Sequence, residues 1–322
     1  MLIRSFLACA LLITIADSVG AQPWPAKQPI RVILPFSPGS SLDTLGRPVF
    51  DHMAKQIGQS FVFEHRPGAG GTLGMAQVAK AEADGYTLLL NSSVQTITPS
   101  TYTLAFDAAR DFVGIAPLAQ FPNVLVVPLS GFKTVSDLVA AAQAKPSSLT
   151  FGSGGVGAAT HLTAERFMLS AGIKAVHVPF KGAPDVLREI LGGRLDFYFS
   201  PLASAMPLIE SNQLRALAVT SGQRSPAAPD IPTRLEAGVP NSEYVFWIGA
   251  FAPAATPRDI VQRLHDTMTK ALADPDVQNG IKKLAAEPMP LTPEKFDDFI
   301  KLEIETNAAL VKAAGITPNR SN

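Results

Sequence analysis

Residues 151–161 read FGSGGVGAATH, and this stretch decides how the rest of the chain is interpreted. A short apolar run over 149–151 predicts a strand that enters the stretch, and the pattern over 159–171 predicts a helix that leaves it. Glycines allow the backbone to approach a ligand closely, and the unpaired N–H groups at the start of a helix favour a phosphate or a carboxylate. The stretch is therefore predicted to form an anion-binding loop.

A second loop with the same design lies near the start of the chain. Residues 30–36 are predicted to form a strand, Ser37-Pro38-Gly39-Ser40-Ser41 a turn, and residues 42–57 a helix. Two such loops that face each other would hold one small anion between two helix starts. The sequence thus favours a binding site that is built largely from backbone groups.

The first 21 residues have the features of an export signal. Arg4 supplies a basic start, residues 6–15 are mostly apolar, and Val19-Gly20-Ala21 has the small residues of a cleavage site. We expect cleavage near Ala21, so that the mature chain begins at Gln22. No later segment reaches the roughly 18 uninterrupted apolar residues that a membrane span needs. A soluble protein of the periplasm is predicted.

The composition narrows the possible classes of protein. Cys9 is the only cysteine and leaves with the signal, which removes disulfides, thiolate metal sites and a cysteine nucleophile. The 27 basic residues balance 27 acidic residues, and this balance argues against nucleic acid or an anionic membrane surface as a partner. A mature chain of about 300 residues is long enough for two domains of ordinary size.

Apolar runs alternate with segments of helical period, which predicts a mainly parallel sheet covered by helices. The first series has strands at 30–36, 61–64, 87–91 and 113–118, with helices at 42–57 and 72–79. The second series has strands at 123–127, 149–151, 175–179, 197–199 and 214–219, with helices at 135–142, 159–171 and 184–191. Helices at 258–272, 275–283 and 293–314 follow, and we expect them to pack on the first series.

Two apolar segments, 114–127 and 245–253, are long enough to pass between the two series and are hinge candidates. The predicted division is therefore residues 22–122 plus 247–322 for domain I and residues 123–246 for domain II. Residues 221–232 are rich in proline and alanine and too short to separate independent modules, so a surface loop is predicted there.

Gly152, Gly154 and Gly157 match the dinucleotide-binding pattern GxGxxG. A nicotinamide-binding unit should carry an acidic residue about 20 positions further on, at the end of the next strand. That region reads VHVPF over 176–180 and has no acidic residue. The sequence therefore disfavours a dinucleotide and leaves two interpretations, a small-anion site and a glycine-rich turn without a ligand.

Signs of catalysis or metal binding are weak. Ser153 lacks the glycine two residues before it that a nucleophile elbow needs, since Phe151 stands there, and a role as hydrogen-bond donor is expected. His161 is the only histidine expected near Ser153. His161 and Glu165 stand one helical turn apart, but no third ligand has suitable spacing, so a surface pair is expected. No catalytic residue, metal or cofactor is predicted.

Asp43 lies just inside the helix that follows the first loop. A carboxylate at this position stabilises the first helical turn. It can also orient loop amides, hold a water against the ligand or receive an amino group, and the sequence leaves these roles open. Arg47 and Arg66 are expected in ion pairs.

Several blocks of sequence, in order, resemble one known family. They are Pro35-Phe36-Ser37-Pro38-Gly39 with Asp43 and Arg47, Arg66-Pro67-Gly68-Ala69-Gly70-Gly71, Ala83-Asp84-Gly85-Tyr86-Thr87-Leu88-Leu89, Gly152-Ser153-x-Gly155 with His161 and Glu165, Pro179-Phe180-Lys181-Gly182, Leu214-Arg215-Ala216-Leu217-Ala218-Val219-Thr220, Pro232-Thr233 with Glu236-Ala237-Gly238, and Trp247-x-Gly249. Together they look like the Bug-type receptors, the extracytoplasmic solute-binding proteins of tripartite tricarboxylate transporters. The match extends across essentially the whole mature chain.

The resemblance implies an α/β type II periplasmic-binding-protein fold, in which two α/β domains joined by two crossing segments close on a ligand in the cleft between them. It also implies that one ligand carboxylate is held by the two loops through backbone amides, hydroxyls and bridging waters. Such contacts suit a neutral protein that binds anions without an arginine clamp.

The chain departs from the family pattern at three positions. Ser40 replaces the second glycine of the first loop, Ala158 replaces the hydroxyl residue that usually follows Gly157, and Ser200 replaces the aspartate that usually follows Phe199. Without that aspartate, the ammonium group of an amino acid would lack a partner. We therefore expect a carboxylate without a positive charge, such as a dicarboxylate or an aromatic acid.

The predicted ligand-binding residues come from the two loops and from predicted strand ends. They are Phe36, Ser37, Pro38, Gly39, Ser40, Asp43, Asn91, Ser92, Ser153, Gly154, Gly155, Val156, Gly157, Ala158, Thr160 and Ser200.

The favoured function is a monomeric periplasmic receptor that captures a small organic carboxylate and delivers it to integral membrane transporter subunits. An exported hydrolase is the main alternative, and it would need a base near Ser153 or Ser37. A ligand sensor that feeds a membrane signalling protein is a third interpretation that the sequence leaves open.

Overall fold

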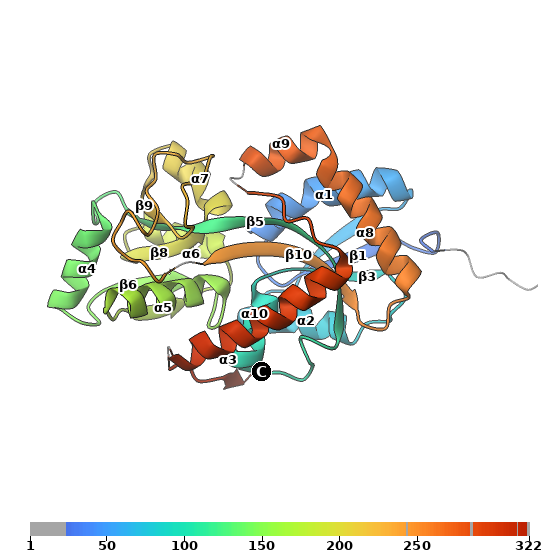
Figure 1. Cartoon of the computed structure of the whole chain (residues 1–322), viewed down its shortest axis with the longest axis horizontal. Coiled ribbons are helices and arrows are strands. Elements are labelled where there is room, and N and C mark those ends of the chain that lie inside the picture. The colour runs from blue at the N-terminus through green and yellow to red at the C-terminus, as the bar shows by residue number, and fades with distance from the viewer. Residues whose placement is uncertain (1–23, 243, 284–285, 314, 321–322) are drawn as a thin grey trace, which may run out of the picture.

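The structure is a computed structural model that describes residues 24–242, 244–283, 286–313 and 315–320. The predicted signal over 1–21 and the expected first residue of the mature chain, Gln22, lie outside the described residues. Two groups of helices and strands lie side by side, and strands β5 (Phe112–Pro128) and β10 (Val245–Pro253) run between them (Figure 1). Among the described residues, no helix has the length and apolar content that a membrane crossing requires.

The first group is built on three parallel strands. β1 (Ile30–Leu34) lies between β2 (Phe61–His65) and β3 (Thr87–Ser92), and β1 and β3 are almost wholly buried, as expected for strands covered on both faces. Its helices are α1 (Ser41–Ile57), α2 (Thr72–Ala79) and α3 (Val94–Thr101), with a 3₁₀ turn η1 (Ala69–Gly71) before α2.

The second group repeats this design. β6 (Thr150–Ser153) pairs in parallel with β7 (Val176–Pro179) and β8 (Phe197–Pro201), and β9 (Leu214–Val219) pairs with β5. Its helices are α4 (Val135–Ala144), α5 (Ala159–Ala171), α6 (Ala183–Leu191) and α7 (Leu202–Glu210). A capping box formed by Thr134 and Asp137 starts α4, and Gly172 ends α5 in the left-handed conformation with φ of 63°.

The long strand β5 belongs to both groups. It pairs antiparallel with β10 from Phe112 to Pro122, and it pairs with β8 and β9 from Asn123 onward. The predicted strands at 113–118 and 123–127 are therefore one continuous strand. The predicted segments 114–127 and 245–253 do cross between the groups, and their role as hinges stays a prediction.

The C-terminal helices α8 (Arg258–Ala273), α9 (Pro275–Lys283) and α10 (Pro293–Ala313) return to the first group, as expected. α8 packs against α1 and β5, and α10 packs against α3 and β5. Phe296 of α10 is fully buried between Trp247 and Phe251 of β10. A short strand β11 (Asn319–Arg320) then pairs with β4 (Tyr102–Thr103).

The core residues form one large cluster, which lies mainly in the first group and extends to α5 and α7, and a cluster on each face of the sheet in the second group. β8 shows how the two faces arise, because successive side chains of a strand point to opposite faces. Phe197 and Phe199 enter one cluster, and Tyr198 enters the other. Of these three residues, only Tyr198 lines the cavity of the candidate site.

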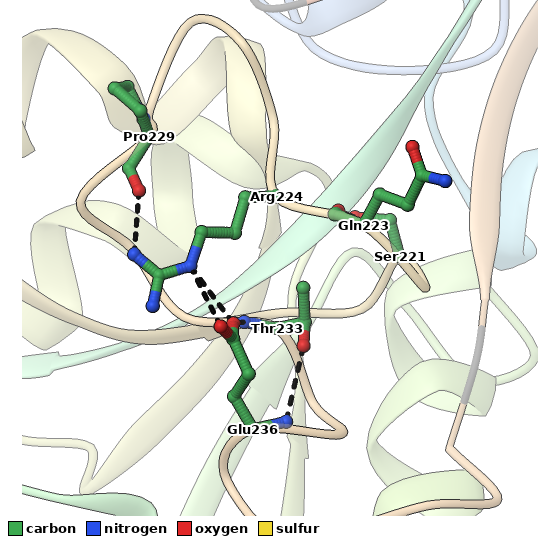
Figure 2. A network of polar contacts seen from close by, with 6 residues as sticks. All are labelled: Ser221, Gln223, Arg224, Pro229, Thr233 and Glu236. Atoms are coloured by element: carbon green, nitrogen blue, oxygen red, sulfur yellow. Dashed lines mark hydrogen bonds and ion pairs between the residues drawn. The ribbon is translucent and has the colours of Figure 1, made fainter.

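The predicted surface loop at 221–232 is fixed by a polar network (Figure 2). Arg224 Nε lies 3.0–3.1 Å from both carboxylate oxygens of Glu236, and its Nη1 donates to Pro229 O at 2.8 Å. Thr233 N donates to Glu236 Oε2 at 2.7 Å, and Glu236 N donates back to Thr233 Oγ1 at 3.2 Å. The hydrogen bonds from Arg224 and from Thr233 lower the pKa of Glu236 to about 2.

One sequence-based expectation about the elements was wrong, and two helices were missed. The sheet is mixed and not mainly parallel, because both crossing strands pair antiparallel to their neighbours. Helices α3 and α7 were not predicted at all.

Candidate ligand-binding site

The candidate site is a cavity at which four helices begin. Its volume is about 40 Å³, well below the range of small-molecule sites. It is lined by Phe36, Ser40, Ser41, Leu42, Ser92, Val94, Gly154, Ala158, Ala159, Thr160, Gly182, Ala183, Tyr198, Pro201 and Phe246. These residues include the first positions of α1, α3, α5 and α6, and none of them carries a charged side chain. The lining therefore offers helix dipoles and hydroxyls to an anion and no full positive charge.

Asp43 organises the first loop. Gly39 N donates to Asp43 Oδ2 at 3.1 Å, and Arg47 Nη2 lies 2.8 Å from Asp43 Oδ1. Burial raises the pKa of Asp43, but the Gly39 amide and the Arg47 guanidinium outweigh it and leave this pKa below its usual value. Asp43 is therefore an ionised group whose charge is already balanced and which orients a loop amide.

Amides of the second loop donate to side chains of the same loop. Gly154 N donates to Thr160 Oγ1 at 3.0 Å, and Gly157 N donates to His161 Nδ1 at 3.0 Å. Gly155 N donates to Ser153 Oγ at 3.1 Å. These bonds fix the shape of the loop and occupy three amides that the sequence analysis expected at the ligand. The first turns of α1 and α5 contribute cavity-lining residues, and the amides of a first turn have no partner within their helix.

Two hydroxyls of the lining have no hydrogen-bond partner among the described residues. They are Ser40 Oγ, from the first group of elements, and Tyr198 OH, from the second, and both residues are buried. A buried hydroxyl without a partner loses its hydration and gains nothing in return. Groups of this kind mark a place where a bound molecule supplies the partner.

The two groups of elements touch beside the cavity. Tyr102 OH, next to α3, donates to Val156 O of the second loop at 2.6 Å. A Cβ atom on Gly157 would lie only 2.2 Å from Thr101 Oγ1, so the Thr101 side chain packs directly against the backbone of the loop. The structure therefore shows the two groups of elements in contact with each other near the cavity.

Beneath the second loop, four polar side chains form a row of contacts. Ser153 Oγ lies 2.6 Å from His177 Nε2, the rings of His177 and His161 stack with centroids 3.8 Å apart, and His161 Nε2 lies 3.3 Å from Glu165 Oε1. The expected surface pair of His161 and Glu165 was wrong, because the His161 side chain is only 6 % exposed and stacks near Phe151.

The expectation that His161 is the histidine nearest Ser153 was also wrong. His177 takes that place, because β7 pairs with β6 in a register that puts His177 opposite Phe151. Ser153 is fully buried and also donates to Gly155 O at 2.9 Å. It does not line the cavity, so the Ser153 and His177 pair is part of the support of the loop.

The structure brings together part of the predicted site. The predicted residues that line the cavity are Phe36, Ser40, Ser92, Gly154, Ala158 and Thr160. The others lie in the same loops or strand ends without lining it, namely Ser37, Pro38, Gly39, Asp43, Asn91, Ser153, Gly155, Val156, Gly157 and Ser200. Asn91 Nδ2 donates to Gln95 Oε1, and Ser200 Oγ donates to Pro201 O, so these two side chains are engaged elsewhere. Ligand contacts by any of these residues stay predictions.

Sequence reasoning missed several lining residues. Phe246 lies on the crossing strand β10, and Tyr198 lies inside an aromatic strand that reads as core. The sequence held one signal for Tyr198. A phenol hydroxyl in a buried strand needs a hydrogen-bond partner, and a ligand can be that partner. Gly182 and Ala183 lie at the start of α6 and were not among the predicted ligand-binding residues.

The chain is similar to known proteins in both sequence and structure. A family model described as "Tripartite tricarboxylate transporter family receptor" matches residues 45–316. The "Protein BugT" of Bordetella pertussis is 32% identical over 305 residues, covering 94% of this chain and 93% of that protein. The structure titled "R. palustris Rpa4515 with adipate" is 33% identical, with a TM-score of 0.88 over 92% of this chain and 100% of that chain. "MatC (Rpa3494) from Rhodopseudomonas palustris with bound malate" is 27% identical, with a TM-score of 0.85 over 89% of this chain and 99% of that chain.

Two α/β groups, two crossing strands and a cavity between helix starts define a two-domain solute-binding protein of the periplasmic type. Within that class, the chain belongs to the receptor family of the tripartite tricarboxylate transporters. It is a solute-binding receptor of the Bug type.

Proposed function

We propose that this receptor captures one small organic carboxylate without a positive charge, encloses it between its two domains and delivers it to the membrane subunits of a tripartite transporter. The observation that carries the proposal is the convergence of the α1 and α5 starts on a cavity whose lining has no charged side chain. Helix starts and hydroxyls suit a carboxylate.

The same lining disfavours a ligand with an ammonium group. No acidic side chain lines the cavity, and Asp43, the nearest candidate from the first loop, is already paired with Arg47 and with the Gly39 amide. A buried ammonium without a partner is costly. The acids in the two similar structures, adipate and malate, are carboxylates without a positive charge, which supports the proposal.

We also propose the domain boundaries, the cleavage site, the location and the oligomeric state that the sequence predicts. The domains are residues 22–122 plus 247–322 and residues 123–246, export ends with cleavage near Ala21, and the receptor acts as a monomer in the periplasm without catalysing a reaction. The position of Ser153 supports the last point, because a nucleophile must reach the substrate and Ser153 is fully buried outside the lining.

Thermal unfolding of the mature protein with a panel of acids tests this proposal. The panel contains mono-, di- and tricarboxylates, aromatic acids and amino acids. An acid at 100 times its dissociation constant should stabilise the protein by about 2.7 kcal/mol, which raises the midpoint by several degrees. We expect a shift with acids that lack a positive charge. Shifts with aspartate or glutamate alone, or no shift with any acid in folded protein shown to be free of bound ligand, would overturn the proposal.

A further inference from the structure

Tyr198 is a fully buried residue of β8 whose ring lines the cavity. Its hydroxyl makes no hydrogen bond to any described residue. Buried phenol hydroxyls almost always have a partner, because an unsatisfied donor in the interior destabilises the fold. Tyr198 lines a cavity where a ligand is expected, and a bound ligand would give this hydroxyl a partner.

Each of the nearest polar neighbours of this hydroxyl makes a hydrogen bond to another group. The side chains of Ser200 and Thr160 interact with the Tyr198 hydroxyl and lower its pKa, but neither contact has the distance and angles of a hydrogen bond. Thr160 Oγ1 accepts the Gly154 amide, and Ser200 Oγ donates to Pro201 O. Burial raises the pKa of Tyr198 above its ordinary value, so the phenol stays protonated and keeps a hydrogen to donate.

A matching group faces the cavity from the other domain. Ser40 Oγ, at the start of α1, is also buried and also has no partner among the described residues. The lining thus includes one residue with an unpaired hydroxyl from each group of elements, together with the starts of α1 and α5.

We infer that Tyr198 is a ligand-binding residue whose hydroxyl donates a hydrogen bond to a carboxylate oxygen of the bound acid, opposite Ser40. This inference rests on the proposed carboxylate-binding function. A hydrogen bond to a charged oxygen is stronger than one to a neutral group, and a phenol supplies it without adding a charge to the cavity. Because Ser40 and Tyr198 belong to different domains, an acid that accepts from both stabilises the closed arrangement.

The test compares Tyr198→Phe with Tyr244→Phe by titration calorimetry with adipate, malate and benzoate. Tyr244 is the matched control, since it is also buried with an unpartnered hydroxyl but does not line the cavity. We expect Tyr198→Phe to weaken binding of the acid by about 10- to 100-fold, and Tyr244→Phe to leave it within a factor of about two. Without acid, both variants should unfold at or above the temperature of the unaltered protein, because each loses an unsatisfied buried donor.

The outcomes separate the inference from the function it rests on. Equal binding by the unaltered protein and by Tyr198→Phe overturns the inference and leaves the carboxylate receptor intact. Weaker binding together with a lower unfolding temperature in the absence of acid assigns Tyr198 a structural role and also overturns it. If no acid binds the unaltered protein, both the proposed function and the inference about Tyr198 are wrong.

Discussion

His177 connects the second loop to the strand beneath it and is predicted to make the stability of the protein depend on pH. Burial and the neighbouring His161 lower the pKa of His177 to about 3. In the unfolded chain a histidine takes up a proton near pH 6.5, so below that pH the unfolded state binds more protons and stability falls as the pH falls toward 3. Between pH 7 and pH 5 this effect amounts to at most about 2 kcal/mol.

The variant His177→Gln checks this directly, because a glutamine amide can still bond to Ser153 but does not titrate. Urea unfolding at pH 7, 6 and 5 should show a clearly shallower loss of stability in the variant than in the unaltered protein. The same slope in both proteins would mean that His177 is not the group responsible.

Individual side chains were the least predictable part of the site. The sequence placed both loops correctly, because strand, glycine-rich turn and helix follow one another locally. It did not place His177 against Ser153, because that contact depends on the register of β7 on β6. Tyr198 was missed for a similar reason, since the alternation of a strand does not say which of its two buried faces borders a cavity.

The loop before α5 approaches α3 so closely that it tolerates only glycine at one position. Gly157 has φ of 72°, and a Cβ there would meet Thr101 at 2.2 Å, across the interface between the domains. We expect Gly157→Ala to prevent full closure and to weaken acid binding by at least about 10-fold, because closure supplies the second half of the contacts.

Gly172 provides the matched control for this element. It has φ of 63°, but a Cβ there meets nothing within 4 Å. Gly172→Ala therefore imposes the same left-handed strain, roughly 1 kcal/mol, without touching the other domain. Titration calorimetry should find normal affinity in Gly172→Ala, and equal losses in the two variants would refute closure as the cause.

Among the elements, those with strong local patterns were predicted and those shaped by their surroundings were not. α3 reads VQTITPST, a run of β-branched residues and a proline that has poor intrinsic helix propensity. It is helical because α10 packs along it. β5 was predicted as two short strands, and only its pairing first with β10 and then with β8 and β9 makes it continuous.

The whole molecule follows from one design, in which two α/β domains share crossing strands and present helix starts to a common cavity. The sequence predicted this architecture well, since the order of its motifs resembles that of a known receptor family across the chain. Ligand identity was beyond reach, because the lining combines residues from both domains and from a crossing strand.

The most direct test of this account is a crystal structure of the mature protein with the acid that stabilises it most in the panel. We predict that one carboxylate lies between the starts of α1 and α5, within hydrogen-bonding distance of Ser40 and of the first-turn amides of both helices. An acid bound outside the cavity, or one whose carboxylate lies away from both helix starts, would contradict the central claim.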